Sequence, residues 1–180
     1  MTPLGKGMFR TTQKRIAIGA LAALLVTLVV VFGPFGHIGA PHPVPANPGE
    51  RLAFAARWLL IPGLSLLVGV GILSNARFMS PAAIEGQRVV DSPAFDINQR
   101  YNLNTLEQTV LAAVAWTGLA LVLPAEQLGL IPRLAVQFGV GRALFWIGYL
   151  YAPWARAFGM GLTSYPTAGA LIWLAWNALT

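Results

Sequence analysis

The chain has 180 residues, of which 56% are hydrophobic and only 10% are charged. A soluble domain usually carries about 25% charged residues, so this composition indicates an integral membrane protein without room for a separate soluble domain. Cysteine is absent, which excludes disulfides, thiolate catalysis and cysteine-ligated metal sites. The net charge of +6 does not indicate nucleic acid as a partner, because four of the twelve basic residues precede the first apolar segment, as membrane topology would place them.

Five apolar segments follow in chain order, each near the roughly 20 residues that a membrane span requires. They cover residues 16–35, about 52–75, about 103–123, about 134–151 and about 160–178. The sequence therefore predicts an all-α integral membrane protein with five spans. We expect a basic N-terminus at 1–15, the first span at 16–35, a Pro- and Gly-rich outer loop at 36–50 and the remaining four helices within 51–180.

The first segment could instead be a signal peptide, because basic residues precede it. Its apolar stretch is longer than the usual run of about 7–15 residues, and no clear A-x-A cleavage site follows, so we favour a retained span. Lys6, Arg10, Lys14 and Arg15 place the N-terminus in the cytoplasm. With five spans, the long polar loop after the second span and the segment "YAPWARAFG" would lie on the same side.

The third segment carries polar residues where an apolar helix would suffice. At 100° per residue, Arg100, Asn104 and Glu107 fall at about 0°, 40° and −20°, so they form one stripe. The structural alternative is that Arg100 is an interfacial anchor and the other two residues join helices. A carboxylate one turn inside a span favours function, because intramembrane ionisable groups are usually paired and functional.

The fourth segment offers a partner for that stripe. Arg142, Phe145, Tyr149 and Arg156 fall at about 0°, −60°, −20° and −40° if the helix continues past Pro153. Arg142 lies about 20 Å deeper than Arg156 at 1.5 Å per residue, so we do not expect it to pair with Glu107. Glu126 is an alternative partner only if its loop folds inward, and a packed structural role is as plausible for Arg142 as a ligand role.

Together these groups suit an anionic, peptide-like ligand that enters from the cytoplasm. Arginines bind carboxylates through bidentate forks, and Glu107 can receive an ammonium group. An arginine at the rim can also stabilise a thiolate. His37 and His42 lie in the proline-rich outer loop with no acidic residue nearby, so we propose no metal site.

Two motifs resemble those of the MAPEG family, the membrane-associated proteins of eicosanoid and glutathione metabolism. The stretch "RYNLNTLEQ" resembles the family signature R-x-(Q/N)-x-N-x-x-E. The stretch "GRALFWIGYLYAPWARAFG" resembles the pattern R-x-x-(Y/H)-x-x-x-Y followed by a catalytic arginine. The resemblance implies a four-helix bundle in residues 51–180, with residues 16–35 as an additional span, and a homotrimer that holds glutathione between subunits.

The resemblance also implies roles for particular residues. It matches Arg156 to the arginine that activates the glutathione thiol. The positions that it matches to glutathione-binding residues are Arg77, Arg100, Asn102, Asn104, Glu107 and Tyr149. Phe145 departs from the pattern because a tyrosine or histidine often stands there, and Gln108 departs because the eukaryotic eicosanoid enzymes usually have an aromatic residue.

We therefore expect an enzyme of the bacterial cytoplasmic membrane that uses glutathione, or a related thiol, as co-substrate. It would conjugate that thiol to a lipophilic electrophile from the bilayer, or reduce the electrophile. The alternative is a non-catalytic membrane subunit that docks to a larger assembly through its additional N-terminal span. A small transporter has less support, since the sequence shows no inverted repeat.

Overall fold

The computed structural model describes residues 3–35, 38–87 and 92–180, with side chains from residue 9 onward. Over these residues the chain is all-helical and contains no strand, which confirms the predicted fold class at that level. The elements in chain order are α1 (Pro3–Phe32), α2 (Pro48–Phe78), α3 (Pro81–Ile84), α4 (Pro93–Val122), the 3-10 turn η1 (Ala125–Gln127), α5 (Leu130–Tyr151) and α6 (Arg156–Leu179).

Local sequence determines where the long helices begin. The Oδ1 of Asn47 accepts a hydrogen bond from the Glu50 backbone N–H at 3.0 Å, and the Glu50 carboxylate accepts one from the Ala46 N–H at 2.7 Å. This reciprocal cap satisfies backbone donors that the start of α2 would otherwise leave unpaired. Pro48 and Pro93 begin α2 and α4, where a missing N–H removes no helical hydrogen bond.

Among the described residues, four helical stretches are long and apolar enough to cross a membrane. They are Phe9–Phe32, Pro48–Phe78, Pro93–Val122 and Ala125–Tyr151. The chain is therefore a membrane protein. Helix α6 has 24 residues, but polar residues between Thr163 and Thr167 interrupt its apolar run, so the count of five spans stays a prediction.

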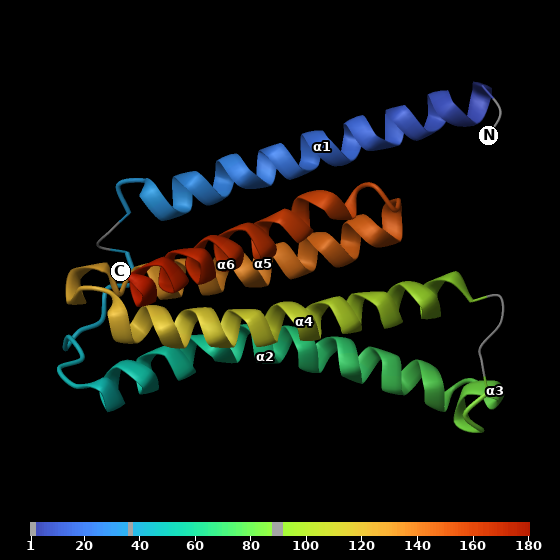
Figure 1. Cartoon of the computed structure of the whole chain (residues 1–180). Coiled ribbons are helices and arrows are strands. Elements are labelled where there is room, and N and C mark those ends of the chain that lie inside the picture. Colours follow the sequence, from blue (N-terminus) through green and yellow to red (C-terminus); the bar gives the residue numbers. More distant parts are fainter. Residues whose placement is uncertain (1–2, 36–37, 88–91) are drawn as a thin grey trace.

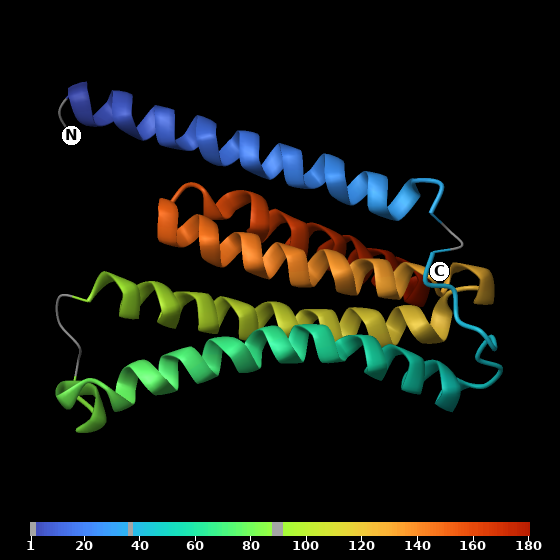
Figure 2. The ribbon, with the colours of Figure 1, turned by 180° about the vertical axis from the view of Figure 1, so that it is seen from behind.

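The long helices run side by side along one axis (Figures 1 and 2). Helix α2 packs along α4, α5 packs along α6, and α1 lies on the outer side of α6. The start of α1, the short α3 and the α5–α6 turn lie at one end of the bundle, which we call the α3 end. Helix η1 and the C-terminus lie at the opposite end, the η1 end. The segments expected on one side of the membrane thus share an end.

Small residues let α5 and α6 approach closely. A Cβ on Gly159 of α6 would clash with the backbone of Phe145 on α5. A Cβ on Gly141 would lie 2.9 Å from Thr163 Cγ2 and 3.0 Å from Leu162 Cβ. This contact brings polar side chains of α6 up to the buried face of α5.

Buried side chains form one cluster toward each end. The cluster toward the η1 end includes Trp116 and Phe138, whose rings meet edge to face with centroids 6.0 Å apart. The second cluster, toward the α3 end, consists of Tyr101, Phe145 and Tyr149. The predicted site residues gather around this second cluster.

The helix boundaries differ from the predicted spans in two places that affect the site. Helix α4 begins at Pro93 rather than at residue 103, so Arg100 lies two turns inside a helix. Helix α5 ends at Tyr151 and does not continue past Pro153. Proline lacks the backbone N–H and disfavours helical geometry in the residue before it, so the chain turns and Arg156 begins α6 instead. The helical angle predicted for Arg156 is therefore wrong.

Candidate functional site

Tyr149 lies between two arginines at the α3 end of the bundle. Its hydroxyl accepts a hydrogen bond from Arg100 Nη1 at 3.3 Å, and Arg156 Cζ lies 4.5 Å from its ring centroid. The tyrosine is buried, whereas Arg100 is exposed and Arg156 is half-buried. The ring thus holds one guanidinium by a cation–π contact and its hydroxyl holds the other. Residues from α4, α5 and α6 meet at this point.

Arg142 is buried on α5, seven residues before Tyr149. Its side chain is 1% exposed, and its hydrogen-bond partners are neutral. Nη1 donates to Asn104 Oδ1 at 2.8 Å, and Nη2 donates to Thr163 Oγ1 at 2.6 Å. The guanidinium also lies 4.7 Å from the Phe145 ring centroid. Neither the partner Asn104 nor Thr163 was expected for Arg142, and Glu126 is an exposed residue of η1.

Asn104 connects Arg142 to Glu107 through hydrogen bonds. Its Nδ2 donates to Glu107 Oε2 at 3.3 Å, while its Oδ1 is held by Arg142. A cation that withdraws charge from the amide oxygen strengthens the amide as a donor. The Glu107 side chain is exposed on the outside of α4. From its buried position, Arg142 thus orients Asn104 and, through it, Glu107 of the predicted polar stripe.

Aromatic rings form the buried wall of the site. Phe145 is 4% exposed and packs against Tyr101 and Tyr149, with ring centroids 6.1 Å and 5.8 Å away. Trp146 donates its indole N–H to Asn98 Oδ1 at 2.9 Å and thereby links α5 to the start of α4. Phe145 therefore offers a ring face to Arg142 instead of a polar group to a ligand.

The comparisons with known proteins bear on this arrangement. The MAPEG family matches residues 52–176, which is more than half of the chain. The chain belongs to the MAPEG family. The matched region contains α4, α5 and nearly all of α2 and α6, and it leaves α1 outside.

Two relatives of this MAPEG chain carry the same name. It is 22% identical to Transmembrane protein 79 of Mus musculus over 161 residues, which are 88% of this chain and 40% of the relative. It is 23% identical to Transmembrane protein 79 of Bos taurus over 156 residues, which are 84% of this chain and 38% of the relative. The chain thus spans about two fifths of the length of these relatives. No solved structure matches it.

Not every residue matched to the MAPEG pattern joins the cluster. Asn102 points toward α2, where its Oδ1 would lie 2.9 Å from a Cβ on Gly69, and this oxygen is buried without a hydrogen-bond partner among the described residues. Arg77 is exposed near the end of α2, and its guanidinium forms no hydrogen bond in the described part of the chain. Gln108 is buried on the inner side of α4, away from the exposed Glu107. One copy of the MAPEG chain thus unites Arg100, Asn104, Glu107, Tyr149 and Arg156.

Thr163 is the residue of this MAPEG site that sequence reasoning missed. The signal available for it was the polar run Thr163, Ser164 and Thr167 within an otherwise apolar helix. Within the ranges that the structure describes, no three His, Cys, Asp or Glu side chains lie together as a metal site would require. His42 is exposed in the segment before α2, and His37 lies outside the described residues.

The charges at this site suit an anionic ligand. Arg100 and Arg156 reach the surface beside Tyr149, and guanidinium groups bind carboxylates through paired donors. Glu107 supplies one negative group beyond them, suited to an ammonium. The arrangement therefore fits a ligand with several carboxylates and one amine.

Proposed function

We propose that this site binds glutathione, or a related thiol peptide, as co-substrate of a membrane transferase or peroxidase. The observation that carries the proposal is the placement of Tyr149 between Arg100 and Arg156. On α4, Arg100 lies one turn before Asn104, which belongs to the Arg142–Asn104–Glu107 chain of hydrogen bonds. Arg100 binds a carboxylate, Glu107 receives the ammonium group, and Asn104 and Tyr149 orient the peptide. The glutathione-binding roles that the family resemblance implies for Arg77 and Asn102 stay proposals, since neither residue joins this cluster within one copy of the chain.

Arg156 stabilises the thiolate in this proposal. Its guanidinium rests on the Tyr149 ring, and in the described part of the chain none of its N–H groups donates to another residue. A fixed cation with free donors favours the ionised form of a nearby thiol. The thiolate sulfur then attacks a lipophilic electrophile, forming a carbon–sulfur bond as the leaving group departs. With a peroxide, the sulfur attacks one oxygen and breaks the O–O bond, the alcohol leaves, and the resulting sulfenic acid of the thiol peptide reacts with a second thiol to give a disulfide and water.

The proposed working form is a homotrimer in a bacterial cytoplasmic membrane, with the N-terminus in the cytoplasm. Support comes from the outer face of α4, where Glu107 is exposed between Leu103 (60% exposed) and Val110 (53% exposed). A carboxylate facing hydrocarbon is costly, so a second copy and a ligand cover it better than lipid does. The basic residues before the first span support the orientation.

A second function, a non-catalytic membrane subunit, is favoured by one observation. Helix α1 lies outside the matched MAPEG region and exposes Ile18 (68%) and Leu21 (58%) on the side away from α6. Such a face can dock to another membrane protein.

Glutathione binding and turnover separate the two functions. We expect calorimetry to detect glutathione binding to the purified protein in detergent. Binding should release protons, because the glutathione thiol ionises to the thiolate. Arg156→Ala should lower kcat/KM for a lipophilic electrophile by about 100-fold, the effect of losing one preorganised charge-stabilising donor. The matched control is Arg57→Ala, because Arg57 is an exposed arginine of α2 whose guanidinium forms no hydrogen bond among the described residues. Absence of both glutathione binding and turnover would leave the subunit function standing, whereas full activity of Arg156→Ala would contradict the role proposed for Arg156.

A further inference from the structure

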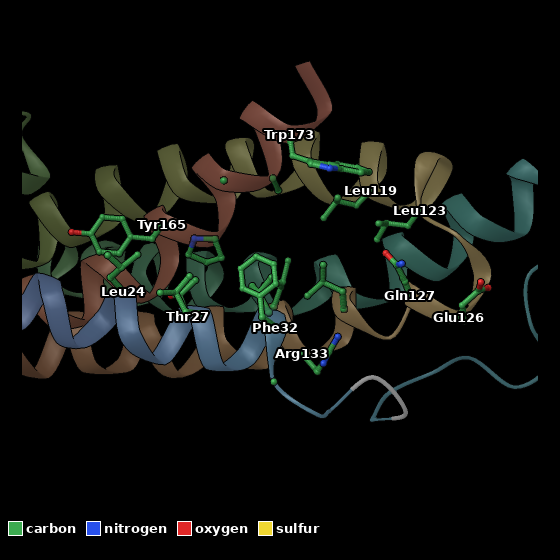
Figure 3. A pocket seen from close by; sticks show the side chains of 18 residues that line it. Leu24, Thr27, Phe32, Leu119, Leu123, Glu126, Gln127, Arg133, Tyr165 and Trp173 are labelled. Atoms are coloured by element: carbon green, nitrogen blue, oxygen red, sulfur yellow. The ribbon is translucent and has the colours of Figure 1, made fainter. Parts of the chain in front are cut away.

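A cavity of about 730 Å³ lies toward the η1 end of the bundle, away from the Tyr149 site. Helix α1, the end of α4, η1, the start of α5 and the second half of α6 line it (Figure 3). Its volume is within the range of about 300–1,000 Å³ that small-molecule sites occupy. Most of its wall is apolar, and the larger side chains include Leu24, Phe32, Leu123, Leu134, Tyr165 and Trp173.

The cavity exists because α1 is fastened to the bundle at a defined point. Gln137 Nε2 donates to Thr27 Oγ1 at 2.7 Å and to the Leu162 carbonyl at 3.0 Å, so it joins α1, α5 and α6. That carbonyl is available because Pro166 lacks the N–H that would normally bond to the residue four positions earlier. Near these hydrogen bonds, Ala23 of α1 packs closely against Gly161 of α6. A Cβ added to Gly161 would lie 2.6 Å from the Ala23 Cβ.

Open space begins beyond this contact. Between Leu24 and Gly33 the cavity follows α1 for about 14 Å, at 1.5 Å per residue. On the α6 side, Gly169 lines the cavity, and a Cβ added there would meet nothing within 4 Å. The cavity is thus an elongated and mostly apolar space, with Thr27 and Tyr165 toward one end and Glu126, Gln127 and Arg133 toward the η1 end (Figure 3).

The polar rim contains Arg133, whose guanidinium has a buried N–H group without a hydrogen-bond acceptor in the described part of the chain. Arg133 of α5 donates from Nε to the Gly129 carbonyl at 3.1 Å, but its Nη1 is buried and has no partner among the described residues. A buried donor without a partner is costly, and an anionic acceptor would satisfy it best. Gln127 lies on the same rim, and Glu126 lies apart from Arg133 at the outer edge (Figure 3).

We propose that this cavity binds a single-chain amphiphile with a carboxylate head group, such as a long-chain fatty carboxylate. The acyl chain lies between α1 and α6, and the carboxylate accepts hydrogen bonds from Arg133 Nη1. A monoanion fits better than a phosphate dianion, because one arginine faces the cavity and Glu126 adds a negative charge to the rim. The site is separate from the proposed thiol site, so either can exist without the other.

Fluorescence quenching at Trp173 tests this proposal. A long-chain carboxylate brominated on its chain is titrated into the full-length protein in detergent, and the signal of a Trp173→Phe variant is subtracted to isolate Trp173. We expect saturable quenching. Arg133→Gln should weaken binding at least about tenfold, as loss of a charge-assisted hydrogen bond would. The brominated alcohol of equal length should bind wild type about tenfold more weakly and should not respond to Arg133→Gln.

Gly169→Leu fills the cavity and should abolish the saturable quenching. Gly71→Leu is the matched control, because a Cβ at Gly71 also meets nothing within 4 Å but lies on α2, outside the cavity. Unchanged binding in Gly169→Leu, or equal affinity for carboxylate and alcohol, would overturn the proposal. Displacement of the carboxylate by an equal concentration of a two-chain anionic phospholipid would overturn the single-chain assignment. If Gly169→Leu does not fold, the comparison of head groups in wild type and Arg133→Gln still decides the matter.

Discussion

Arg142 is a buried side chain that holds other residues of the proposed site in place. Its guanidinium is shared between Asn104 and Thr163, which come from different helices, and it rests on the ring of Phe145. Removing one partner of a buried cation strongly destabilises the folded protein. The position of Asn104, and through it Glu107, thus depends on a threonine of α6.

Thr163→Val tests this dependence at the residue scale. Valine keeps the shape of threonine but leaves Arg142 Nη2 without its acceptor at 2.6 Å. We expect the free energy of unfolding to fall by about 2 kcal/mol, within the range for a hydrogen bond to a charged group. The measurement is a titration with denaturing detergent in mixed micelles.

Thr167→Val is the matched control for that measurement. Thr167 is also buried in α6, but its hydroxyl donates only to the Thr163 carbonyl at 2.8 Å. We expect a loss below about 1 kcal/mol, because no charge is left unpaired. Equal losses in the two variants would show that Arg142 does not depend on Thr163.

At the scale of elements, the contact of α1 with α6 joins a helix outside the matched MAPEG region to a helix within it. The contact combines close packing at Ala23 with the hydrogen bonds of Gln137, and Arg15 Cζ lies 4.9 Å from the ring centroid of Trp154 in the α5–α6 turn. The added helix therefore contacts both the turn that precedes Arg156 and the first half of α6. It is an integral part of the bundle.

Gln137→Leu should loosen this helix selectively. The substitution removes the hydrogen bonds to Thr27 Oγ1 and the Leu162 carbonyl, but it also removes Gln137 Oε1, which is buried without a partner among the described residues. We therefore expect a net loss of about 1 kcal/mol in unfolding free energy. Amide hydrogen exchange should become faster in α1 and stay unchanged in α4.

The exposed Gln13 of α1 provides the control, as Gln13→Leu makes the same chemical change without touching the α1–α6 contact. Exchange in α1 that is equally slow in Gln137→Leu and in wild type would mean that side-chain packing alone holds the helix.

At the scale of the whole molecule, α4 presents a face that a single chain leaves uncovered. Leu103, Glu107, Val110 and Val114 lie on one side of this helix, and all four are exposed. The combination of apolar side chains around one carboxylate is typical of a helix interface in a membrane, where polar groups are paired. This face is where we expect subunits to meet.

Val110→Trp should therefore disrupt the proposed trimer. A bulky ring at this position cannot be accommodated between closely packed helices, so we expect monomers by light scattering with correction for bound detergent. Ile18→Trp is the control, because Ile18 is 68% exposed on α1 and lies outside the proposed interface. A wild-type protein that is monomeric in several detergents would contradict the trimer.

Much of the fold could be predicted from the sequence, because long apolar runs and helical periodicity are local properties. The stripe of Arg100, Asn104 and Glu107 follows from 100° per residue alone. The partners of Arg142 could not be predicted, because Thr163 reaches it only through the close α5–α6 contact at Gly141. The predicted angle of Arg156 was wrong because Pro153 ends the helix.

By itself, the sequence determined that this is an all-helical membrane protein of the MAPEG type, since composition, apolar segments and two short motifs are readable without tertiary contacts. Only the tertiary structure decided that Tyr149 joins Arg100 to Arg156, that Arg142 is held by Asn104 and Thr163, and that a cavity opens beside α1. The physical reason is that these features depend on how closely helices distant in sequence approach each other. That approach is determined by small residues, prolines and buried polar groups acting across the bundle.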